Sequence, residues 1–404
     1  MKEAGENVSE KKSPKRLFVP SLTILIFAIS LSSGVLTLFL PEIAETFFGS
    51  TDRTAIGLVS QTSTINNVAE VIFAFIMSFL VIRFKHKSLL TVGAVLVIIS
   101  TIGSFLAPDF LTFQIFFALE GAGSIMVSII AITIIGDTFS LNKKPRAVSW
   151  YAAGMYMAGL IGIPILLVVA NIAGWRSTFL LFVLPVSLLG LILAYKSIPS
   201  KTNSQQPKNN EAMYLKNFRS VLLNKSAAHC LLGATVGATA VVALFVLTFY
   251  RQQFLVSRDW TVGIALINAS LFMIGSLVGG RMVNRFGSKL IAVLFSLISG
   301  ILTMAFFNMP TLGLTLAFNF ASVFTGALAI PAIICFTVDQ VPKSRGTMMS
   351  LQRLFSNIGA AIGAAIGGIL LALFSYQALG IGFGILIITQ ATIFLFLVKQ
   401  PTET

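Results

Sequence analysis

The stretch Gly279 to Lys289, GGRMVNRFGSK, combines glycines and cations between two long apolar runs. The run that leads into it, Thr261 to Val283, and the run that follows, Leu290 to Phe307, are each long enough for a helix to cross a bilayer. A short polar connection with glycines permits a sharp turn between two such helices at the membrane surface. The stretch therefore predicts a turn between two membrane-spanning helices.

The composition of the whole chain is that of an integral membrane protein. Of its 404 residues, 56% are hydrophobic and 10% are charged, and the mean hydropathy is +0.92. Such a chain has too little polar surface to cover a water-soluble globule. Length and hydropathy predict an all-α integral membrane protein with about twelve transmembrane helices. The predicted spans are Leu17–Leu40, Thr54–Ile82, Ser88–Leu106, Phe110–Ile135, Ala147–Ile172, Ser177–Ala194, Ala227–Tyr250, Thr261–Val283, Leu290–Phe307, Leu312–Val338, Met348–Phe374 and Ala378–Val398.

The positive charges lie mostly on one side of the predicted membrane. The formal net charge is +14, and the cations concentrate in both tails and in the connections after spans 2, 4, 6, 8 and 10. The opposite connections contain only Arg53, Arg176, Arg251 and Arg258. The positive-inside rule therefore predicts that both termini lie in the cytoplasm. We expect a multi-pass protein of a prokaryotic plasma membrane. The charge follows from topology and indicates no nucleic-acid partner.

The chain divides into two groups of six spans. We predict a cytoplasmic N-terminal tail at 1–16, a six-helix bundle at 17–196, a cytoplasmic linker at 197–225, a second six-helix bundle at 226–398 and a C-terminal tail at 399–404. Apolar and basic residues alternate at the end of the linker, from Met213 to Lys225. This pattern fits either an interfacial amphipathic helix or an irregular segment.

Matching motifs indicate an internal repeat. LVIRFKHKSL, Leu80 to Leu89, follows span 2, and MVNRFGSKLI, Met282 to Ile291, follows span 8. KKPRA after span 4 and PKSRG after span 10 match at nearly the same offset. Two matches at one offset suggest duplication of a six-span unit, which predicts two pseudo-symmetric bundles of the kind found in many secondary transporters.

The chain resembles the major facilitator superfamily from Leu17 to Val398. The family motif G-x-L-x-D-R-x-G-x-K is similar to the loop after span 8, and the loop after span 2 matches it at Leu80, Arg83 and Lys87. The resemblance implies a conformational-switch role for Arg83, Lys87, Gly280, Asn284, Arg285, Gly287 and Lys289. Ile82 and Asn284 stand where the family has Asp, so we expect a weak cytoplasmic latch; the alternative is that the arginines only anchor the topology.

Span 5 resembles the drug:proton antiporter branch of that superfamily. It reads AAGMYMAGLIGIP from Ala152 to Pro164 and is followed by GWRSTF. The resemblance implies packing or gating roles for Gly154, Gly159, Gly162 and Pro164. In span 4 the arginine of proton-coupled members is absent, and Glu120 occupies the place of a glutamine.

A few polar residues lie where the bilayer makes them costly. Ser63, Asn66, Asn67 and Glu70 recur at helical spacing in span 2 and form one stripe that must face protein or water. A carboxyl at Glu70 can take up and release a proton as its exposure changes. The alternative is a hydrogen-bonded packing residue.

Two further spans carry candidate site residues. Glu120 shares a helix face with Ser124, and it either serves the same function as Glu70 or makes a structural hydrogen bond. Arg353 lies near Asn357 in span 11. It can pair with one of the acids, bind an anionic substrate, or reach the cytoplasmic surface with its long side chain.

The sequence contains no enzymatic motif. His86 and His229 lack metal-ligand spacing and no phosphate-binding loop is present, so we expect no metal, cofactor or ATP hydrolysis. We predict a secondary transporter of a small organic solute that works by alternating access and is coupled to protons. Efflux of a hydrophobic or cationic compound is favoured, uptake of a sugar or organic acid is the alternative, and a non-transporting receptor-like or lipid-handling protein is a minor one. The family resemblance implies a monomer.

Overall fold

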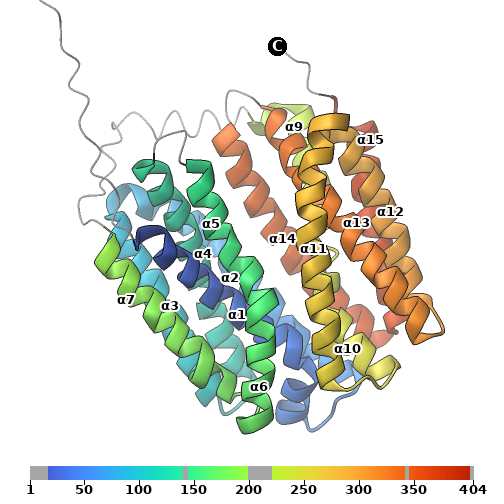
Figure 1. Cartoon of the computed structure of the whole chain (residues 1–404), viewed down its shortest axis with the longest axis horizontal. Helices are drawn as coiled ribbons and strands as arrows, with labels where there is room; N and C mark the ends of the chain where they lie inside the picture. The colour runs from blue at the N-terminus through green and yellow to red at the C-terminus, as the bar shows by residue number, and fades with distance from the viewer. Residues whose placement is uncertain (1–16, 140–143, 199–220, 342–344, 401–404) are drawn as a thin grey trace, which may run out of the picture.

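The computed structural model describes residues 17–139, 144–198, 221–341 and 345–400. In these ranges the chain forms long helices that run roughly side by side (Figure 1). The first half of the chain contains α1 (Phe18–Phe48), α2 (Arg53–Arg83), α3 (His86–Leu106), α4 (Phe110–Thr138), α5 (Lys144–Met157), α6 (Ile163–Ala173) and α7 (Leu184–Ser197). The second half contains α9 (Lys225–Ala238), α10 (Val242–Gln253), α11 (Arg258–Phe286), α12 (Ser288–Asn308), α13 (Leu312–Asp339), α14 (Arg345–Leu373) and α15 (Tyr376–Phe396).

The helices account for the predicted spans. In the described part of the chain, 11 helical segments are long and apolar enough to cross a membrane. The helix α2, with 31 residues, packs against α4 and α14 and corresponds to the remaining predicted span. The all-α membrane fold predicted from hydropathy is confirmed. The predicted interfacial helix at 213–225 lies mostly outside the described residues, of which Val221–Leu223 are helical.

The predicted span Ala227–Tyr250 lies within the apolar helical segment Lys225–Gln253, which is long enough to cross a membrane, but its helix is interrupted. The span is divided at Thr239–Val241 into α9 and α10. The backbone of Val241 leaves the helical region, and short-range bonds such as that from the Val241 amide to the Thr239 carbonyl replace the helical ones. Gly359 and Gly363 of α14 lie against the carbonyls of Thr235 and Thr239, so a neighbouring backbone supports the break.

Span 1 is also different from the prediction, which ended it at Leu40. The helix α1 continues to Phe48 and has a kink at Phe39, where the dihedral angles are φ −113° and ψ 21°. Pro41 follows within the same helix. Proline removes a helical hydrogen bond and its ring displaces the preceding turn, so the kink has a local cause.

Span 5 has a different irregularity. A π-helical turn, η1 (Ala158–Gly162), joins α5 to α6, and Pro164 lies in the first turn of α6. A second π-helical turn, η2 (Phe179–Val183), precedes α7. Wide π turns inside long helices occur often at functional sites.

The two halves of the chain pack in the same order. The contact of α3 with α4 is repeated by α12 with α13, that of α2 with α4 by α11 with α13, and that of α1 with α7 by α9 with α15. Between the halves, α2 packs on α14, while α11 contacts η1 and α6. This arrangement agrees with the repeat read from the loop motifs.

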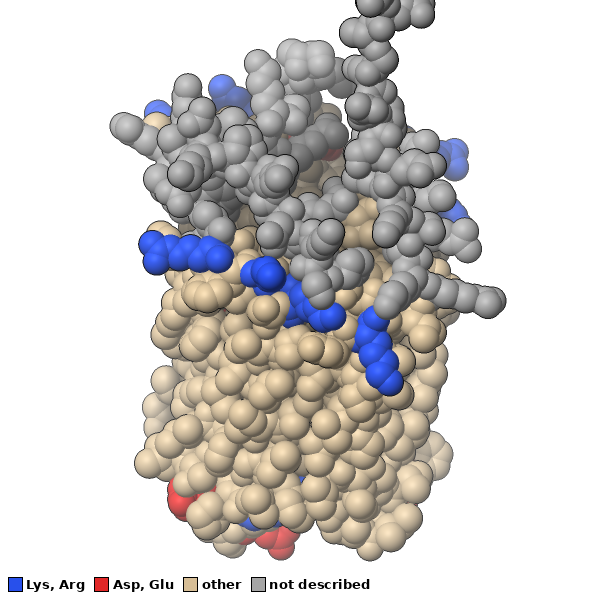
Figure 2. Space-filling model, turned by 90° about the vertical axis from the view of Figure 1, so that its left-hand side faces the viewer, with Lys and Arg blue, Asp and Glu red and all other residues tan. Residues whose placement is uncertain are grey.

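The two ends of the bundle differ in charge. We call the end where α1 begins and α15 ends the termini side, and the opposite end the far side. On the face shown in Figure 2, most of the Lys and Arg residues lie near the termini side, acidic residues and a small basic area lie at the far side, and a broad uncharged belt separates the two ends. Such a belt is the surface expected to face lipid.

Candidate functional site

The helices α2 and α4 cross closely at the level of the polar stripe. A Cβ atom on Gly121 would collide with the backbone oxygen of Asn66, so glycine allows this approach. The Asn66 Nδ2 group donates hydrogen bonds to the Phe117 carbonyl at 2.8 Å and to Glu120 Oε2 at 2.5 Å. Glu120 is 1% exposed, and its Oε1 has no partner among the described residues. Asn66 therefore provides the observed bond to a deeply buried carboxyl group.

Glu70 lies one turn further along α2 and connects three helices. The Ser124 hydroxyl of α4 donates to Glu70 Oε1 at 2.8 Å, and Asn357 Nδ2 of α14 donates to Glu70 Oε2 at 2.7 Å. The Ser124 hydroxyl also lies 3.0 Å from the Gly121 carbonyl. Because a hydroxyl has one proton, Ser124 can donate to only one of these oxygens at a time. Glu70 thus joins the first half of the chain to the second through a titratable group.

Two other predicted site residues do not join this network by hydrogen bonds. Asn67 Nδ2 donates within its own helix, to the Ser63 carbonyl at 2.7 Å. Arg353 is solvent-exposed on α14, one turn before Asn357, and its charge is close enough to interact with Glu70. The structure therefore brings together Glu70, Asn66, Glu120 and Asn357, and leaves Arg353 beside them.

The predicted switch loops lie at the termini side. Gly287 joins α11 to α12 with φ +85°, a conformation that favours glycine. Lys289 Nζ donates to the Val398 carbonyl at 2.7 Å, and the Lys87 ammonium lies 4.3 Å from the centre of the Tyr195 ring. Both contacts stay within one half of the chain. The remaining residues Arg83, Asn284 and Arg285 are exposed, and Gly280 has open space where a Cβ would lie.

The glycines of span 5 have different neighbours. A Cβ on Gly154 would collide with α1 at Ile26 and the Thr23 carbonyl, and one on Gly162 would collide with Leu31. At Gly159 the nearest atom would be the Ala269 Cβ of α11, at 3.5 Å. Gly154 and Gly162 thus pack span 5 on α1, whereas Gly159 faces the second half of the chain.

A cluster of ion pairs joins the halves at the far side, and sequence reasoning did not identify it. Glu42, at the end of α1, accepts from Arg251 Nη1 at 2.8 Å and lies 3.5 Å from Arg258 Nη1. Asn171 contacts Arg258 and Asp259, and Gln252 contacts Thr51. The available signal was that charged residues end span 1, end span 7 and begin span 8.

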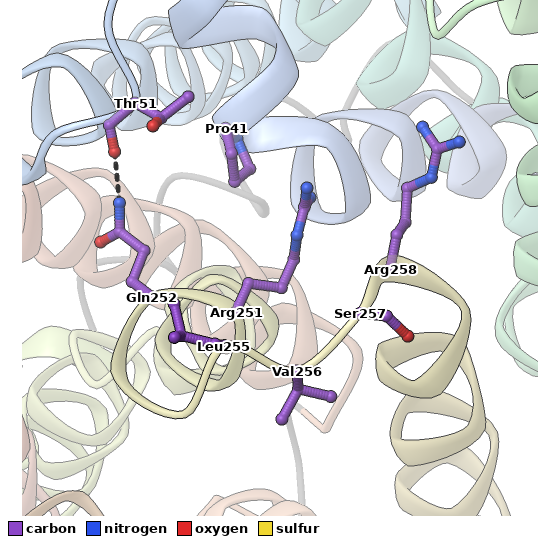
Figure 3. Close-up of a pocket in the computed structure, with 8 residues that line it drawn as sticks. All are labelled: Pro41, Thr51, Arg251, Gln252, Leu255, Val256, Ser257 and Arg258. Carbon is purple, nitrogen blue, oxygen red and sulfur yellow. Dashed lines mark hydrogen bonds between the residues drawn. The ribbon is translucent and has the colours of Figure 1, made fainter.

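A pocket of about 290 Å³ opens beside these ion pairs (Figure 3). In Figure 3, Arg251 and Arg258 extend from the ends of α10 and α11 toward α1, and a hydrogen bond joins Gln252 to Thr51. The pocket lies beside the far-side ends of α10 and α11 rather than near Glu70. Its lining comes from both halves of the chain and belongs to their contact at the far side. Its walls are formed by Pro41, Thr51, Arg251, Gln252, Leu255, Val256, Ser257 and Arg258.

Further bonds between the halves follow α2 and α14 inward from the far side. Arg53 Nη1 donates to the Phe374 carbonyl at 2.7 Å, and Gln61 Nε2 donates to the Ala365 carbonyl at 3.3 Å. The Glu70–Asn357 bond comes next along the same pair of helices. Within the described ranges, the hydrogen bonds that we observe between the halves thus extend from the far side to Glu70.

The described residues contain no group of three or more His, Cys, Asp or Glu side chains that could hold a metal ion. The polar groups of the site are carboxyls, amides and a hydroxyl. The carboxyls can take up and release protons, and the amides and the hydroxyl donate and accept hydrogen bonds. The chemistry of this donor set is binding and proton transfer.

The comparison with protein-family models shows to which family the chain belongs. The model of the Major Facilitator Superfamily matches residues 22–279 and 259–404. The chain belongs to the major facilitator superfamily. It is 24% identical over 352 residues to YceJ, an uncharacterized MFS-type transporter of Bacillus subtilis (strain 168), covering 86% of this chain and 87% of the relative. This superfamily member is therefore a multi-pass secondary transporter of small solutes and not an enzyme.

Two solved transporter structures have the same fold. The D-xylose-proton symporter superposes with a TM-score of 0.76 at 16% identity, covering 96% of this chain and 98% of that one. A bacterial homologue of the human lysosomal transporter Spinster, in an inward-facing and unoccupied conformation, superposes with a TM-score of 0.73 at 17% identity, covering 95% and 96%. At this identity the likeness concerns the fold alone.

Proposed function

We propose that the protein exports a small organic solute in exchange for protons and that Glu70 is the proton-binding group. The observation that supports this proposal is the position of Glu70, which accepts one hydrogen bond from Ser124 in its own half and one from Asn357 in the other half. A charge change at such a group acts on the contact between the halves. Coupling of alternating access to protons requires a group whose charge affects the contact between the halves, because the two halves must move relative to one another.

The charge of Glu70 determines how strongly the halves are joined. A carboxylate accepts the two bonds as charge-assisted hydrogen bonds, which are roughly twice as strong as neutral ones. A protonated carboxyl becomes a donor at one oxygen, and Ser124 can then turn its own proton to the Gly121 carbonyl. The bond from Asn357 weakens at the same time. Proton uptake thus favours separation of α2 from α14 at this level, and proton release favours their contact.

Glu120 supports this role from α4. Its Oε2 is bonded to Asn66 and its Oε1 has no partner in the described part of the chain. We propose that Glu120 holds α2 in register with α4, so that Ser124 remains within reach of Glu70. The glycine at position 121 allows the two helices to approach closely enough for both bonds.

Export is the direction that the resemblance of span 5 to drug:proton antiporters favours. We also propose that both termini lie in the cytoplasm, that the two six-helix units are 17–196 and 226–398, and that the protein acts as a monomer in a prokaryotic cytoplasmic membrane. The monomer has a mass of 43.4 kDa, which light scattering of the purified protein in detergent will test after subtraction of the detergent.

The experiment uses purified protein in liposomes with an imposed pH gradient. Internal pH is recorded while lipophilic cations, sugars and organic acids are added one at a time. We expect solute-dependent proton movement in the direction of antiport; movement in the opposite sense would establish uptake by symport instead. Glu70→Gln is expected to lose this proton movement while it still exchanges labelled solute across the membrane.

The matched control is Glu45→Gln, which removes an exposed carboxyl at the far end of α1, away from the Glu70 network. This variant should keep wild-type proton movement. Solute-coupled proton movement that persists at full rate in Glu70→Gln would contradict the assignment of Glu70.

A further inference from the structure

Arg353 is a charged side chain within a membrane-spanning helix. It lies in the third turn of α14, which runs from Arg345 to Leu373, and its side chain is solvent-exposed. A charge at this depth costs several kcal/mol unless water or an opposite charge accompanies it. The exposed surface of Arg353 must therefore face water or a ligand rather than hydrocarbon.

The surroundings of Arg353 place it toward the other half of the chain. Its charge is close enough to interact with Glu70 of α2 and with the buried Tyr151 of α5. Asn357, one turn further along α14, reaches Glu70 directly. Because α2 and α5 belong to the first half and α14 to the second, Arg353 extends toward the space between the halves.

No acidic group holds Arg353 in a salt bridge within the described residues. The ion pairs observed there are those of Glu42 with Arg251 and Arg258 at the far side. Glu70 has hydrogen bonds at both oxygens, from Ser124 and Asn357. Glu120 is buried and bonded to Asn66. The guanidinium of Arg353 therefore has its donors available to a ligand.

We propose that Arg353 binds an anionic group of the transported solute, either a carboxylate or a phosphate or sulfate ester. The inference rests on the proposed transport function and specifies its substrate class. A guanidinium presents a planar fork of donors that matches these anions in two parallel hydrogen bonds. An uncharged or cationic solute offers no such partner.

The position of Glu70 links the anion to the proton. A charged Glu70 lowers the positive potential around Arg353, and a neutral Glu70 leaves it undiminished. Removal of the negative charge at Glu70 therefore strengthens the attraction of Arg353 for an anion. Proton and anion then favour each other's binding, which is the linkage of symport rather than of antiport, and the sign of proton movement in liposomes distinguishes the two. Glu120, the other acid of the network, is expected to have a smaller effect because it is bonded to Asn66 on the α4 side of α2.

The test measures the charge preference of the space beside Arg353. Ser356, three residues along the same helix face and half-buried, is replaced by cysteine after Cys230 and Cys335 have been changed to serine. The rates at which an anionic sulfonate and a cationic trimethylammonium methanethiosulfonate modify the Ser356→Cys thiol are compared in detergent. Benzoate and its uncharged analogue benzamide are then added as protecting solutes.

We expect the anionic reagent to be favoured relative to a free small thiol. Arg353→Gln should lower the ratio of the two rates about fivefold or more, as expected from the loss of a unit charge some 8 Å away in a water-filled space. Arg353→Lys, which keeps the charge, should retain most of the preference, and Glu70→Gln should increase it. Benzoate should slow labelling more than benzamide does, and Arg353→Gln should remove this difference.

Three outcomes would overturn the proposal. The first is a rate ratio of the Ser356→Cys protein that does not change when Arg353→Gln is added. The second is a failure of the folded Ser356→Cys protein to react with either reagent. The third is equal protection by benzoate and benzamide. Size-exclusion chromatography of each variant establishes that it is folded. The measurement needs no gradient and no transport, so failure of proton coupling in liposomes is distinguishable from failure of this inference.

Discussion

Side chains of α2 and α4 form hydrogen bonds with one another where the two helices are in contact. Asn66 of α2 donates to Glu120 of α4, and Ser124 of α4 donates to Glu70 of α2. Each carboxyl thus has a neutral partner on the opposite helix. Within a bilayer such bonds matter because no solvent replaces a lost partner in the hydrocarbon region.

Removal of the Asn66 amide tests this arrangement. Asn66→Ala leaves the buried Glu120 without its observed partner, and we expect a loss of about 1–3 kcal/mol in the free energy of unfolding. Asn67→Ala serves as the control, because Asn67 bonds only within its own helix. Thermal unfolding in detergent measures both. Equal losses in the two variants would show that the Asn66–Glu120 bond contributes nothing specific.

The double variant Asn66→Leu with Glu120→Leu sharpens the test. Replacement of both partners by apolar groups removes the unsatisfied buried carboxyl, so we expect part of the lost stability to return. A double variant that is less stable than Asn66→Ala would indicate that the volume at this crossing, rather than the hydrogen bond, limits stability.

At the scale of helices, glycines determine which elements approach one another. A Cβ on Gly279 would meet the backbone of Leu328 at 2.5–3.0 Å, whereas one on the neighbouring Gly280 would meet nothing within 4 Å. Gly279 therefore serves the packing of α11 on α13. Gly280 matches the family loop motif, but this structure has room for a larger side chain at that position.

Adjacent alanine substitutions separate these two roles. We expect Gly279→Ala to cost about 1–3 kcal/mol through overpacking, and Gly280→Ala to be neutral or to stabilise the helix by up to about 1 kcal/mol. Thermal unfolding gives the stabilities, and liposome transport gives the activities. Normal stability with reduced transport in Gly280→Ala would support a switch role for this loop; normal values of both would contradict it.

The far-side ion pair of Glu42 with Arg251 joins two helices that are irregular. Glu42 follows the kink of α1 at Phe39, and Arg251 lies in α10, after the break in span 7. A kink or break allows the outer segment of a helix to move without the rest of the helix. The ion pair is partly exposed, with side-chain exposures of 21% for Arg251 and 17% for Glu42. Its contribution is therefore modest.

Loss of the Glu42 carboxylate should open the far side more often. We expect Glu42→Gln to increase the population of far-side-open molecules about twofold to fivefold, which corresponds to about 0.5–1 kcal/mol. Spin labels at Leu111→Cys and Leu373→Cys, both exposed at the far side, report the distance between the halves. Glu45→Gln is the control. An unchanged distance distribution in Glu42→Gln would exclude a latch role.

For the whole molecule, the distribution of charge determines orientation. The cations near the termini side are expected to remain in the cytoplasm, which places the far side outside the cell. In intact cells a membrane-impermeant maleimide should label Asn308→Cys at the far side. It should label Lys85→Cys at the termini side only after permeabilisation. The reverse pattern would invert the proposed topology and, with it, the direction of transport.

The amino-acid sequence alone determined the membrane class, the positions of most spans, the repeat and the polar stripe of α2. These features depend on local quantities, namely the length of apolar runs, helical spacing and the side on which cations gather. Helix ends differed most at the end of α1, which was predicted at Leu40 and lies at Phe48, because polar and apolar side chains both fit the membrane surface. The break within span 7 was not predicted, because it depends on how closely the glycines of α14 approach the backbone of Thr235 and Thr239.

Only the tertiary structure decided which polar groups meet. Glu70 bonds to Ser124, 54 positions away, and to Asn357, 287 positions away, and no periodicity in one helix specifies such partners. The same holds for Glu42 with Arg251, which join the two halves across 209 positions. The sequence shows which charged and polar side chains lie within or beside the bilayer, because hydropathy can be read from each residue and its neighbours along the chain. Their pairing depends on how the spanning helices pack against one another, which is a property of the whole chain.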